Sequence, residues 1–426
     1  MIAWLLVGFM WLYVHRPFEI WTFLATYRLL LVYTICLIIV WLFSVLSNPN
    51  SKRQLGNIFT PAILLYTLAI TAATLFSPFT SVFENGALTD WFKHIVFFVI
   101  LMTSVKTEKD LKIVVTGFSV AFFLWMAHSY RGYLSGNAFF EAGAYRIKPY
   151  GITFANANDY GTLIVCVLPL ILPLIALCKR YWHYLFILGY VLLSLRSMML
   201  TGSRGALVML VVLMVLPVLF SRHRFKLLVV MAIAAPVGWQ SISEEMQNRY
   251  RTIWDRSVSR EANANLEGRM EGFYGGLQNW ENYPIFGAGP GQHGQALGNT
   301  FRAHNLAGEL LGELGTFGVV AFLLMLSCFG INHYNIWKNY KYLREKNLGK
   351  EGLYCWWVSL AIVYAIVMLQ IQGFGLHIAY WFHWIWFGAF QALAVMIMQE
   401  KVDAAIQGKL LPSLPDTQSG YKVQTR

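Results

Sequence analysis

Long apolar runs recur from one end of this 426-residue chain to the other, and they restrict its fold more than any other feature. Most are between about 16 and 26 residues long, which suits helices that cross the hydrocarbon core of a bilayer. Because that core holds no water to satisfy the backbone, runs without polar alternation must form helices. We therefore predict an all-α, polytopic membrane protein with about twelve transmembrane helices. The predicted spans are residues 1–14, 20–46, 58–77, 91–105, 112–130, 159–178, 183–200, 203–220, 225–241, 304–331, 353–374 and 378–398.

The charges support this topology. The chain is 57% hydrophobic and 13% charged, and a soluble domain carries about twice that share of charge. A net charge of +12 would suggest nucleic-acid binding in a soluble protein, but here the positive residues of the short loops are concentrated in every second loop. The positive-inside rule then places both termini in the cytoplasm. The five cysteines form no CxxC motif, so neither a disulfide framework nor a metal site is indicated.

Four segments follow from the predicted topology. Residues 1–241 hold helices one to nine, 242–303 form one large outside loop, 304–398 hold helices ten to twelve, and 399–426 form a disordered cytoplasmic tail. The large loop contains two amphipathic helix patterns, from Met246 to Val258 and from Leu266 to Trp280. We expect both helices to lie flat on the bilayer. The aromatic run at 380–386 is predicted to form an interfacial belt.

One candidate anion site lies where Thr201-Gly202-Ser203-Arg204 opens the run at 203–220. An arginine at membrane depth is costly and indicates function by default. The helix N-terminus adds unpaired N–H groups and a positive dipole end, and the hydroxyl of Ser203 adds a donor. The alternative is an arginine that snorkels to the lipid headgroups. Arg196, inside the preceding run, is a second candidate that could instead pair with a neighbouring span.

His304 lies at the start of another apolar run, two residues after Arg302. The positive end of that helix should lower the pKa of His304 and favour a neutral imidazole that can accept a proton. The alternative is a hydrogen-bonded interfacial histidine. Glu309 and Glu313 follow on the same helix, where they could orient an arginine or contact a sugar hydroxyl. Structural pairing is the simpler role for Glu313.

The large loop carries arginine but no lysine, which suits planar, bidentate recognition of phosphate. Arg269 lies on the second amphipathic helix, and Gly289 belongs to the glycine-rich turn at 287–291. The alternative for each arginine is ordinary pairing with one of the seven carboxylates of the loop. The six arginines are Arg249, Arg251, Arg256, Arg260, Arg269 and Arg302. Histidines and carboxylates are too few at ligand spacing to predict a metal site.

Together these motifs resemble the O-antigen ligase superfamily, which includes O-antigen polymerases and bacterial protein O-oligosaccharyltransferases. The likeness rests on Ser203-Arg204-Gly205-Ala206, Arg269 before NYPIFGAG at 282–289, His304-Asn305, and ELLGELGTFG at 309–318. Twelve spans with one large periplasmic loop between the ninth and tenth also match. The resemblance covers residues 90–400 or so. The segment from Trp91 to Asp159 is similar to the exosortase-associated O-glycosylation ligases.

This resemblance implies a metal-independent membrane glycosyltransferase of the GT-C type. It would act without a cofactor on the periplasmic side of the bacterial inner membrane, in lipopolysaccharide or other polysaccharide synthesis, and would not bind nucleic acid. Its donor would be a glycan on undecaprenyl pyrophosphate, and its acceptor another glycan, a lipid-linked core or a protein side chain. The family's catalytic roles carry over to Arg204 and Arg269, as pyrophosphate binders, and to His304 at the acceptor hydroxyl. The substrate-binding candidates are Arg302, Ser203, Glu309, Arg196 and Gly289.

Two other interpretations stay open. A polymerase that extends the glycan by repeat units differs from a ligase only in its acceptor. A transporter for a lipid-linked sugar belongs to a different class, and it would typically show inverted repeats and helices broken in matching halves. The sequence has no internal repeat of that kind.

Overall fold

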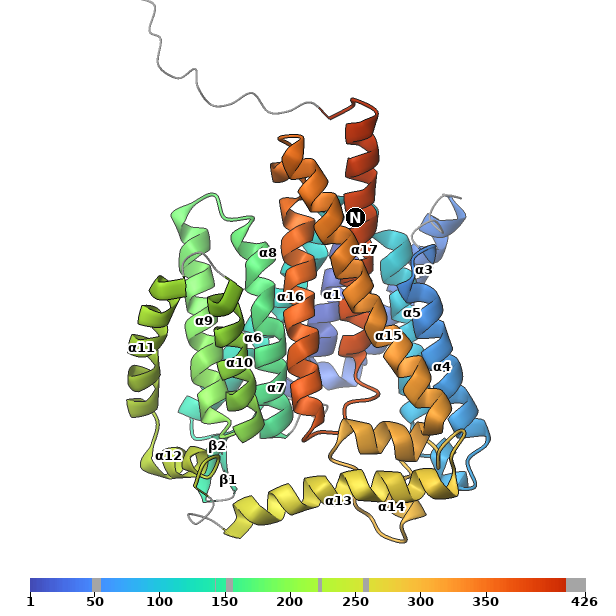
Figure 1. Cartoon of the computed structure of the whole chain (residues 1–426), viewed down its shortest axis with the longest axis vertical. Helices are drawn as coiled ribbons and strands as arrows, with labels where there is room; N and C mark the ends of the chain where they lie inside the picture. Colours follow the sequence, from blue (N-terminus) through green and yellow to red (C-terminus); the bar gives the residue numbers. More distant parts are fainter. Residues whose placement is uncertain (48–54, 142, 151–155, 221–223, 256–259, 411–426) are drawn as a thin grey trace, which may run out of the picture.

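The computed structural model describes residues 1–47, 55–141, 143–150, 156–220, 224–255 and 260–410. Each predicted span corresponds to a helix or helical run in this part of the chain (Figure 1). They are α1 (Ile2–Val14), α3 (Leu29–Leu46), α4 (Phe59–Leu75), α5 (Ala87–Ser104), α6 (Glu108–Leu134), α7 (Ala157–Val167) continued by η4 (Leu168–Leu170) and α8 (Ile171–Ile175), α9 (Tyr181–Leu200), α10 (Arg204–Phe220), α11 (Arg224–Gln240), α15 (Leu306–Glu345), α16 (Gly349–Gly373) and α17 (Phe382–Ile406).

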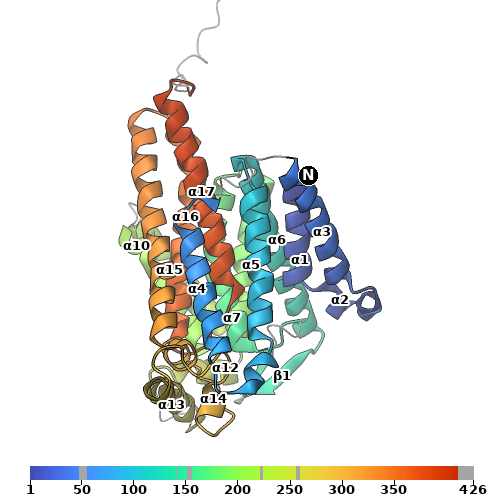
Figure 2. The same cartoon turned by 90° about the vertical axis from the view of Figure 1, so that its right-hand side faces the viewer.

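Eight helical segments of the described residues are long and apolar enough to cross a membrane, and α4 and α10 are shorter apolar helices. The all-α polytopic architecture is therefore confirmed, while the count of twelve crossings stays a prediction. Successive helices are joined alternately at the two ends of the bundle (Figures 1 and 2). At one end α15, α16 and α17 extend beyond the other helices, and the N-terminus lies on that side (Figure 1).

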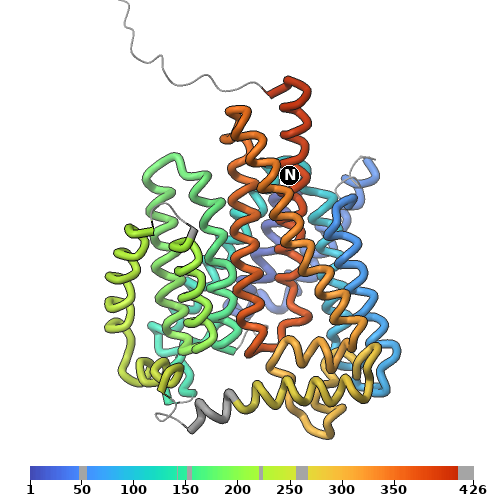
Figure 3. Tube along the Cα trace, viewed as in Figure 1, coloured from blue at the N-terminus to red at the C-terminus, as the bar shows by residue number. Residues whose placement is uncertain are grey.

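The opposite end, called the loop end below, carries the short elements. α13 lies across this end, and α10 and α15 both begin there (Figure 3). The elements gathered at the loop end are α2 (Pro17–Ile20), η1 (Thr22–Tyr27), η3 (Thr80–Phe83), the antiparallel hairpin of β1 (Ala138–Glu141) and β2 (Ala144–Ile147), α12 (Glu244–Arg251), α13 (Arg260–Asn282) and α14 (His293–Ala296). α12 ends seven residues before Val258, which lies outside the described residues.

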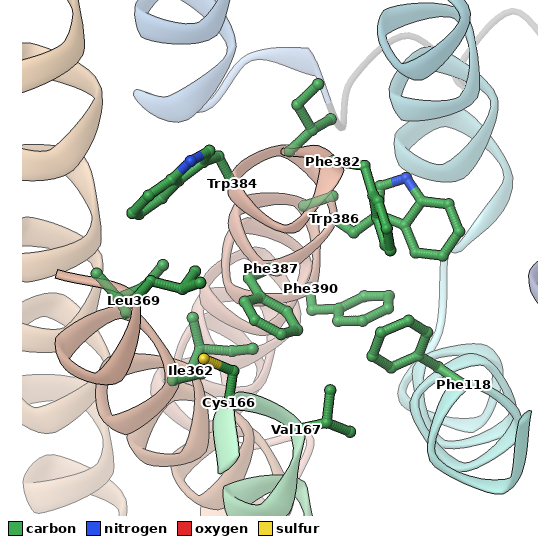
Figure 4. Close-up of a cluster of buried hydrophobic side chains, with 14 of the residues drawn as sticks. Phe118, Cys166, Val167, Ile362, Leu369, Phe382, Trp384, Trp386, Phe387 and Phe390 are labelled. Atoms are coloured by element: carbon green, nitrogen blue, oxygen red, sulfur yellow. The ribbon is translucent and has the colours of Figure 1, made fainter. Parts of the chain in front are cut away.

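The centre of the bundle is α17. Trp384, Trp386, Phe387 and Phe390 are fully buried and pack against aromatic and aliphatic side chains of neighbouring helices, among them Phe118 of α6 (Figure 4). The predicted interfacial belt at 380–386 is therefore wrong for most of its length. These rings face protein rather than headgroups, because α17 is enclosed by α4, α5, α6, α15 and α16.

α15 is broken at Gly315, where φ is +63° and ψ is −165°. A Cβ at this position would lie 2.5 Å from the carbonyl oxygen of Ile285, so only glycine fits. The loop at 284–289 pairs with the break: the amides of Thr316 and Phe317 donate to the carbonyls of Pro284 and Ile285 at 2.9 and 3.1 Å. The segment 306–314 therefore turns away from the long span that follows it (Figure 1).

Candidate active site

The turn that leads into α10 is fixed by two arginines from other parts of the chain. Arg146 Nε, on β2, donates to the carbonyl oxygen of Thr201 at 2.5 Å. Arg249 Nε, on α12, donates to the carbonyl oxygen of Gly202 at 2.7 Å. Gly202 has a φ of +60°, and a Cβ there would lie 2.8 Å from the Arg249 side chain. The backbone just before Arg204 is thus held by β2 and α12 rather than by α9 or α10 alone.

Arg204 is the first residue of α10, and its Nη1 donates to Thr252 Oγ1 at 3.1 Å. The positive charges of Arg269 and Arg249 both act on the Arg204 guanidinium. Three guanidinium groups are therefore near one another at the loop end. Like charges repel, so this arrangement favours a bound anion.

A cavity of about 380 Å³, called the arginine cavity below, lies beside Arg204. Arg204 and Arg269 supply the positive charge of the cavity, and Val208 and Phe374 form part of its apolar wall. None of the described residues that line it carries a carboxylate. They are Arg204, Gly205, Val208, Thr252, Ile253, Arg269, Ile371, Gln372, Phe374 and Gly375. The cavity can hold an anionic group that is attached to a hydrocarbon chain.

Arg269 reaches this cavity from α13. Its guanidinium packs against Gly375, where a Cβ would lie 3.0 Å from Arg269 Cζ. Burial lowers the pKa of the Arg269 guanidinium from its ordinary value. The side chain is therefore less hydrated than that of a surface arginine and interacts more strongly with an anion.

Glycines bring α13 into backbone contact with the start of α15. A Cβ at Gly272 would lie 1.5 Å from the carbonyl oxygen of Ala303, and a Cβ at Gly276 would lie 2.3 Å from that of Gly308. Larger residues cannot be accommodated without moving one helix. This contact sets the position of Arg269 relative to His304. Arg269 lies three residues before Gly272, and His304 directly follows Ala303.

His304 has a φ of +41°, a left-handed conformation that is uncommon for a residue other than glycine. Its ring contacts that of His377 edge-on, with 5.1 Å between the centroids. Burial lowers the pKa of His304, and the charges of Arg269 and Arg302 lower it further. The lowered pKa favours a neutral imidazole, and its causes here are burial and two arginines rather than the helix end from which the sequence predicts it.

A second cavity of about 420 Å³, called the histidine cavity below, lies beside His377. Arg302 Nη1 lies 3.3 Å from His377 Nε2. The lining residues are Asn85, Ala87, Gly291, His293, Gly294, Gln295, Asn299, Thr300, Phe301, Arg302, Ala303, Glu309, Glu313, His377 and Tyr380. Because Arg269 of the arginine cavity and His377 of the histidine cavity both interact with His304, that residue connects the two sites.

Glu309 and Glu313 are buried in the wall of the histidine cavity and hold nearby loops. Glu309 Oε2 accepts the amide of Ala379 at 2.9 Å. Glu313 Oε2 accepts the amide of Gly291 at 2.6 Å and the hydroxyl of Tyr380 at 2.9 Å. Each carboxyl group keeps a further lone pair for a ligand hydroxyl.

Four of the candidates named from the sequence line neither cavity in the described part of the chain. His304 is one of them, and it is placed beside the cavities only through its neighbours Arg269 and His377. Ser203 is buried, and its Oγ accepts the amide of Ala206 at 3.3 Å, as a helix cap does. Arg196 Nη1 donates to the Ser241 carbonyl oxygen at 2.7 Å. Arg196 is therefore paired with another part of the chain, which is the alternative that the sequence left open for it. Gly289, with a φ of +106°, belongs to the loop that pairs with α15.

Sequence reasoning missed other residues of the site. Arg146 lies on β2, in a short hairpin between α6 and α7, and its role depends on partners far along the chain. Gln372 and His377 lie in or near the turn between α16 and α17, which hydropathy describes only as the end of a span. Within the residues that the structure describes, no group of three or more His, Cys, Asp or Glu could hold a metal ion.

Comparison with protein families gives one match. A family described as O-antigen ligase matches residues 188–323. The match confirms the resemblance to the O-antigen ligase superfamily, and it contains Arg204, Arg269, Arg302 and His304. No curated protein matches the chain.

The similarity to O-antigen ligases and the bundle of apolar helices support a multi-pass membrane protein and a glycosyltransferase-like enzyme. The family acts on lipid-linked glycans, which agrees in general terms with a cavity that joins arginines to an apolar wall. The match ends at residue 323. The turn at 374–382, whose residues help to line both cavities, is therefore not part of the matched region. The assignment to the exosortase-associated branch stays a prediction.

Proposed function

We propose that this enzyme transfers a glycan from undecaprenyl pyrophosphate to an acceptor hydroxyl on the periplasmic side of the bacterial inner membrane. The observation that carries the proposal is the arginine cavity: Arg204 and Arg269 line one space together with apolar side chains, and Arg249 lies close by. A diphosphate would lie against the guanidinium groups, and the first isoprene units against Val208, Ile371 and Phe374.

The leaving group defines what the site has to do. As the bond between the anomeric carbon and the diphosphate oxygen breaks, negative charge grows on that oxygen. Preorganised arginines stabilise this charge most effectively where water is limited. Gln372 adds an amide at the same cavity, close to Gly205 of α10. The reaction then needs no metal, because the cations belong to the protein.

His304 supplies the other half of the reaction. The acceptor oxygen attacks the anomeric carbon from the side opposite the diphosphate, forms the new glycosidic bond and inverts the configuration. The neutral His304 takes the hydroxyl proton or orients the hydroxyl. Arg302, His293 and the carboxylate oxygens of Glu309 and Glu313 in the histidine cavity contact the sugars around that hydroxyl.

Four segments organise this activity. Two sets of transmembrane helices, 1–241 and 304–398, enclose the lipid part of the donor, and the loop at 242–303 covers the reacting groups from the periplasm. We place the remaining residues, from 399, on the cytoplasmic side; the structure describes 399–410 of them, and 411–426 lie outside the described residues. α17 continues to Ile406, so that the first eight of them complete a helix rather than belong to the predicted disordered tail.

The proposal is tested with purified protein in proteoliposomes and a lipid-linked glycan donor. Arg204→Ala and Arg269→Ala should each lower the transfer rate about 100-fold or more, since removing one oxyanion donor has an effect of that size. Arg196→Ala is the matched control, because Arg196 bonds Ser241 outside both cavities. Wild-type rates in both cavity variants would rule the proposal out, and movement of the donor across the bilayer without transfer would favour a transporter.

A repeat-unit polymerase is the alternative within the same chemistry. A strain that lacks the gene separates the two: loss of a ligase leaves lipid-linked polymer, whereas loss of a polymerase leaves single repeat units. The arginine cavity is equally suited to both, because the donor is the same.

A further inference from the structure

α15 is longer than a membrane span requires (Figure 1). The part that follows the break at Gly315 runs from Thr316 to Glu345, which is about 45 Å at 1.5 Å per residue. The hydrocarbon core of a bilayer is about 30 Å thick, and the headgroup layers bring the total to about 40–45 Å. This part of α15 is therefore long enough to cross the hydrocarbon and to continue through the headgroups opposite the loop end.

The exposed face of α15 changes in character along its length. It is aliphatic near the break, where Val320 and Leu323 are about half exposed. It becomes aromatic at Tyr334 and Trp337, which are 60% and 45% exposed and whose ring centroids lie 5.8 Å apart. From Thr316 to Trp337 the helix rises about 32 Å, which matches the hydrocarbon core. The two rings thus lie where tyrosine and tryptophan are enriched, at the boundary between hydrocarbon and headgroups.

Positive side chains follow directly after the two rings. Residues 338–350 hold five of them and one carboxylate, Glu345. Lys341 Nζ lies over the ring of Trp337, 5.8 Å from its centroid. All five positive residues are exposed, and none of them forms an ion pair with another residue that the structure describes. They are Lys338, Lys341, Arg344, Lys346 and Lys350.

Other lysines on the same side of the bundle are neutralised by the protein itself. Lys112 and Lys401 both pair with Glu108 at the start of α6. Lys401 also pairs with Glu351 of α16 at 3.7 Å. The positive charge on α15 is different, because it is unbalanced and continues an apolar face that suits lipid. Anions that balance it have to come from outside the chain.

We propose that the end of α15, residues 334–350, binds anionic phospholipid headgroups in the leaflet opposite the loop end, which is the cytoplasmic leaflet in the proposed orientation. Lys338 and Lys341 lie within about 6 Å of Trp337 along the helix axis, and each headgroup layer is about 5–7 Å deep. Lipid phosphates therefore lie at the level of these side chains. Each lysine or arginine near an anionic membrane surface adds to the attraction.

This interaction fixes the depth of α15 in the bilayer. Headgroups bound at one end hold the break at Gly315 near the opposite surface, together with the residues before it that line the histidine cavity. The inference goes beyond the proposed function, and its test requires no glycan transfer.

Photolabelling tests the surface with the full-length protein in proteoliposomes of four parts phosphatidylcholine to one part phosphatidylglycerol. A trace of phosphatidylglycerol carries a diazirine in its acyl chain, close to the headgroup. Cross-links should concentrate in the peptide that contains Tyr334 and Trp337, and they should decrease as salt screens the charges. Equal labelling by a diazirine phosphatidylcholine would overturn the proposal. Loss of labelling on addition of ATP at constant ionic strength would also overturn it, because the ligand would then be a soluble phosphate.

Two triple variants separate this surface from the charge of the whole end. Removal of three α15 cations should lower the labelling at least fivefold, in Lys338→Gln/Lys341→Gln/Arg344→Gln. The matched control removes three exposed cations at the ends of α6, α9 and α17 and should label like wild type; it is Lys109→Gln/Lys179→Gln/Lys409→Gln. Equal loss in both variants would refute the site. Lys338→Arg/Lys341→Arg keeps the charge and should keep the labelling, and a fivefold loss there would contradict recognition by charge.

Discussion

Replacing Gly272 by alanine tests whether the docking of α13 positions the reacting groups. The added Cβ would lie 1.5 Å from the carbonyl oxygen of Ala303, and an ordinary contact needs 3.4 Å, so the backbones must separate by about 1.9 Å. Ala303 directly precedes His304, and Arg269 lies one turn earlier on α13. Misplacement of reacting groups by 1 Å can lower a rate about 100-fold. We therefore expect the Gly272→Ala rate to fall by at least that factor.

The assay is the transfer rate of the purified variant under saturating donor, together with its thermal midpoint. Gly268→Ala is the matched control on the same helix, since a Cβ there meets no atom within 4 Å. Alanine is also a better helix former than glycine by about 1 kcal/mol, so Gly268→Ala should be at least as stable as wild type. If Gly272→Ala and Gly268→Ala retain equal activity, the close approach of α13 and α15 does not position the site.

Three further predictions concern single side chains of the site. The pKa of His304 is lowered by burial and by nearby arginines, so the acid limb of the activity profile should lie below the ordinary range of histidine. Arg302→Gln removes one positive neighbour, which raises the pKa of His304 and should move the acid limb of the kcat/KM profile to higher pH. Arg146→Met removes charge-assisted bonds to Thr201 and Asn158, which should lower stability by about 2–3 kcal/mol; an unchanged thermal midpoint would contradict that role. Arg204→Lys keeps the charge but loses the planar fork, so donor KM should rise more than tenfold while expression in the membrane stays normal.

Hydropathy predicted the helices well because the bilayer leaves the backbone few choices. The predicted span 58–77 corresponds to Phe59–Leu75, and 183–200 to Tyr181–Leu200. The tenth span was predicted to end at 331, but α15 continues to Glu345. Its last turns are too polar for the membrane and remain helical because Ile336 and Leu343 are buried against neighbouring helices. Hydropathy measures solubility in lipid, whereas helix length also depends on packing.

The same scale could not distinguish lipid-facing from protein-facing side chains. The aromatic run at 380–386 was predicted to form an interfacial belt, yet Trp384 and Trp386 are fully buried. Lipid tails are as apolar as a protein core, so a membrane helix that is hydrophobic all round can occupy the centre of the bundle. Its position follows from contacts between helices that are distant in sequence, and a single sequence does not reveal those contacts.

The charged part of the site was more predictable than its neighbours. Arg204 and His304 were named because charged groups at helix ends are costly and conspicuous in an apolar sequence. Arg269 was named because it lies in the arginine-rich loop and matches the family resemblance. Arg146 was not named, because its partner Thr201 lies 55 residues further on. Ser203 was named for a free hydroxyl that the structure uses as a helix cap. Polarity indicates that a side chain needs a partner, and only the fold specifies which partner it has.

The positions of the arginines imply that donor binding and the docking of α13 support each other. Arg269 is carried by α13, Arg204 by α10, and their charges repel when the arginine cavity holds no anion. The backbone contact at Gly272 and Gly276 holds α13 in place against this repulsion. A diphosphate between the guanidiniums turns repulsion into attraction, so the free energy of donor binding also stabilises the docked helix. Because His304 follows the segment that Gly272 touches, the group that we propose as the acceptor of the hydroxyl proton should be placed most firmly when the donor is present.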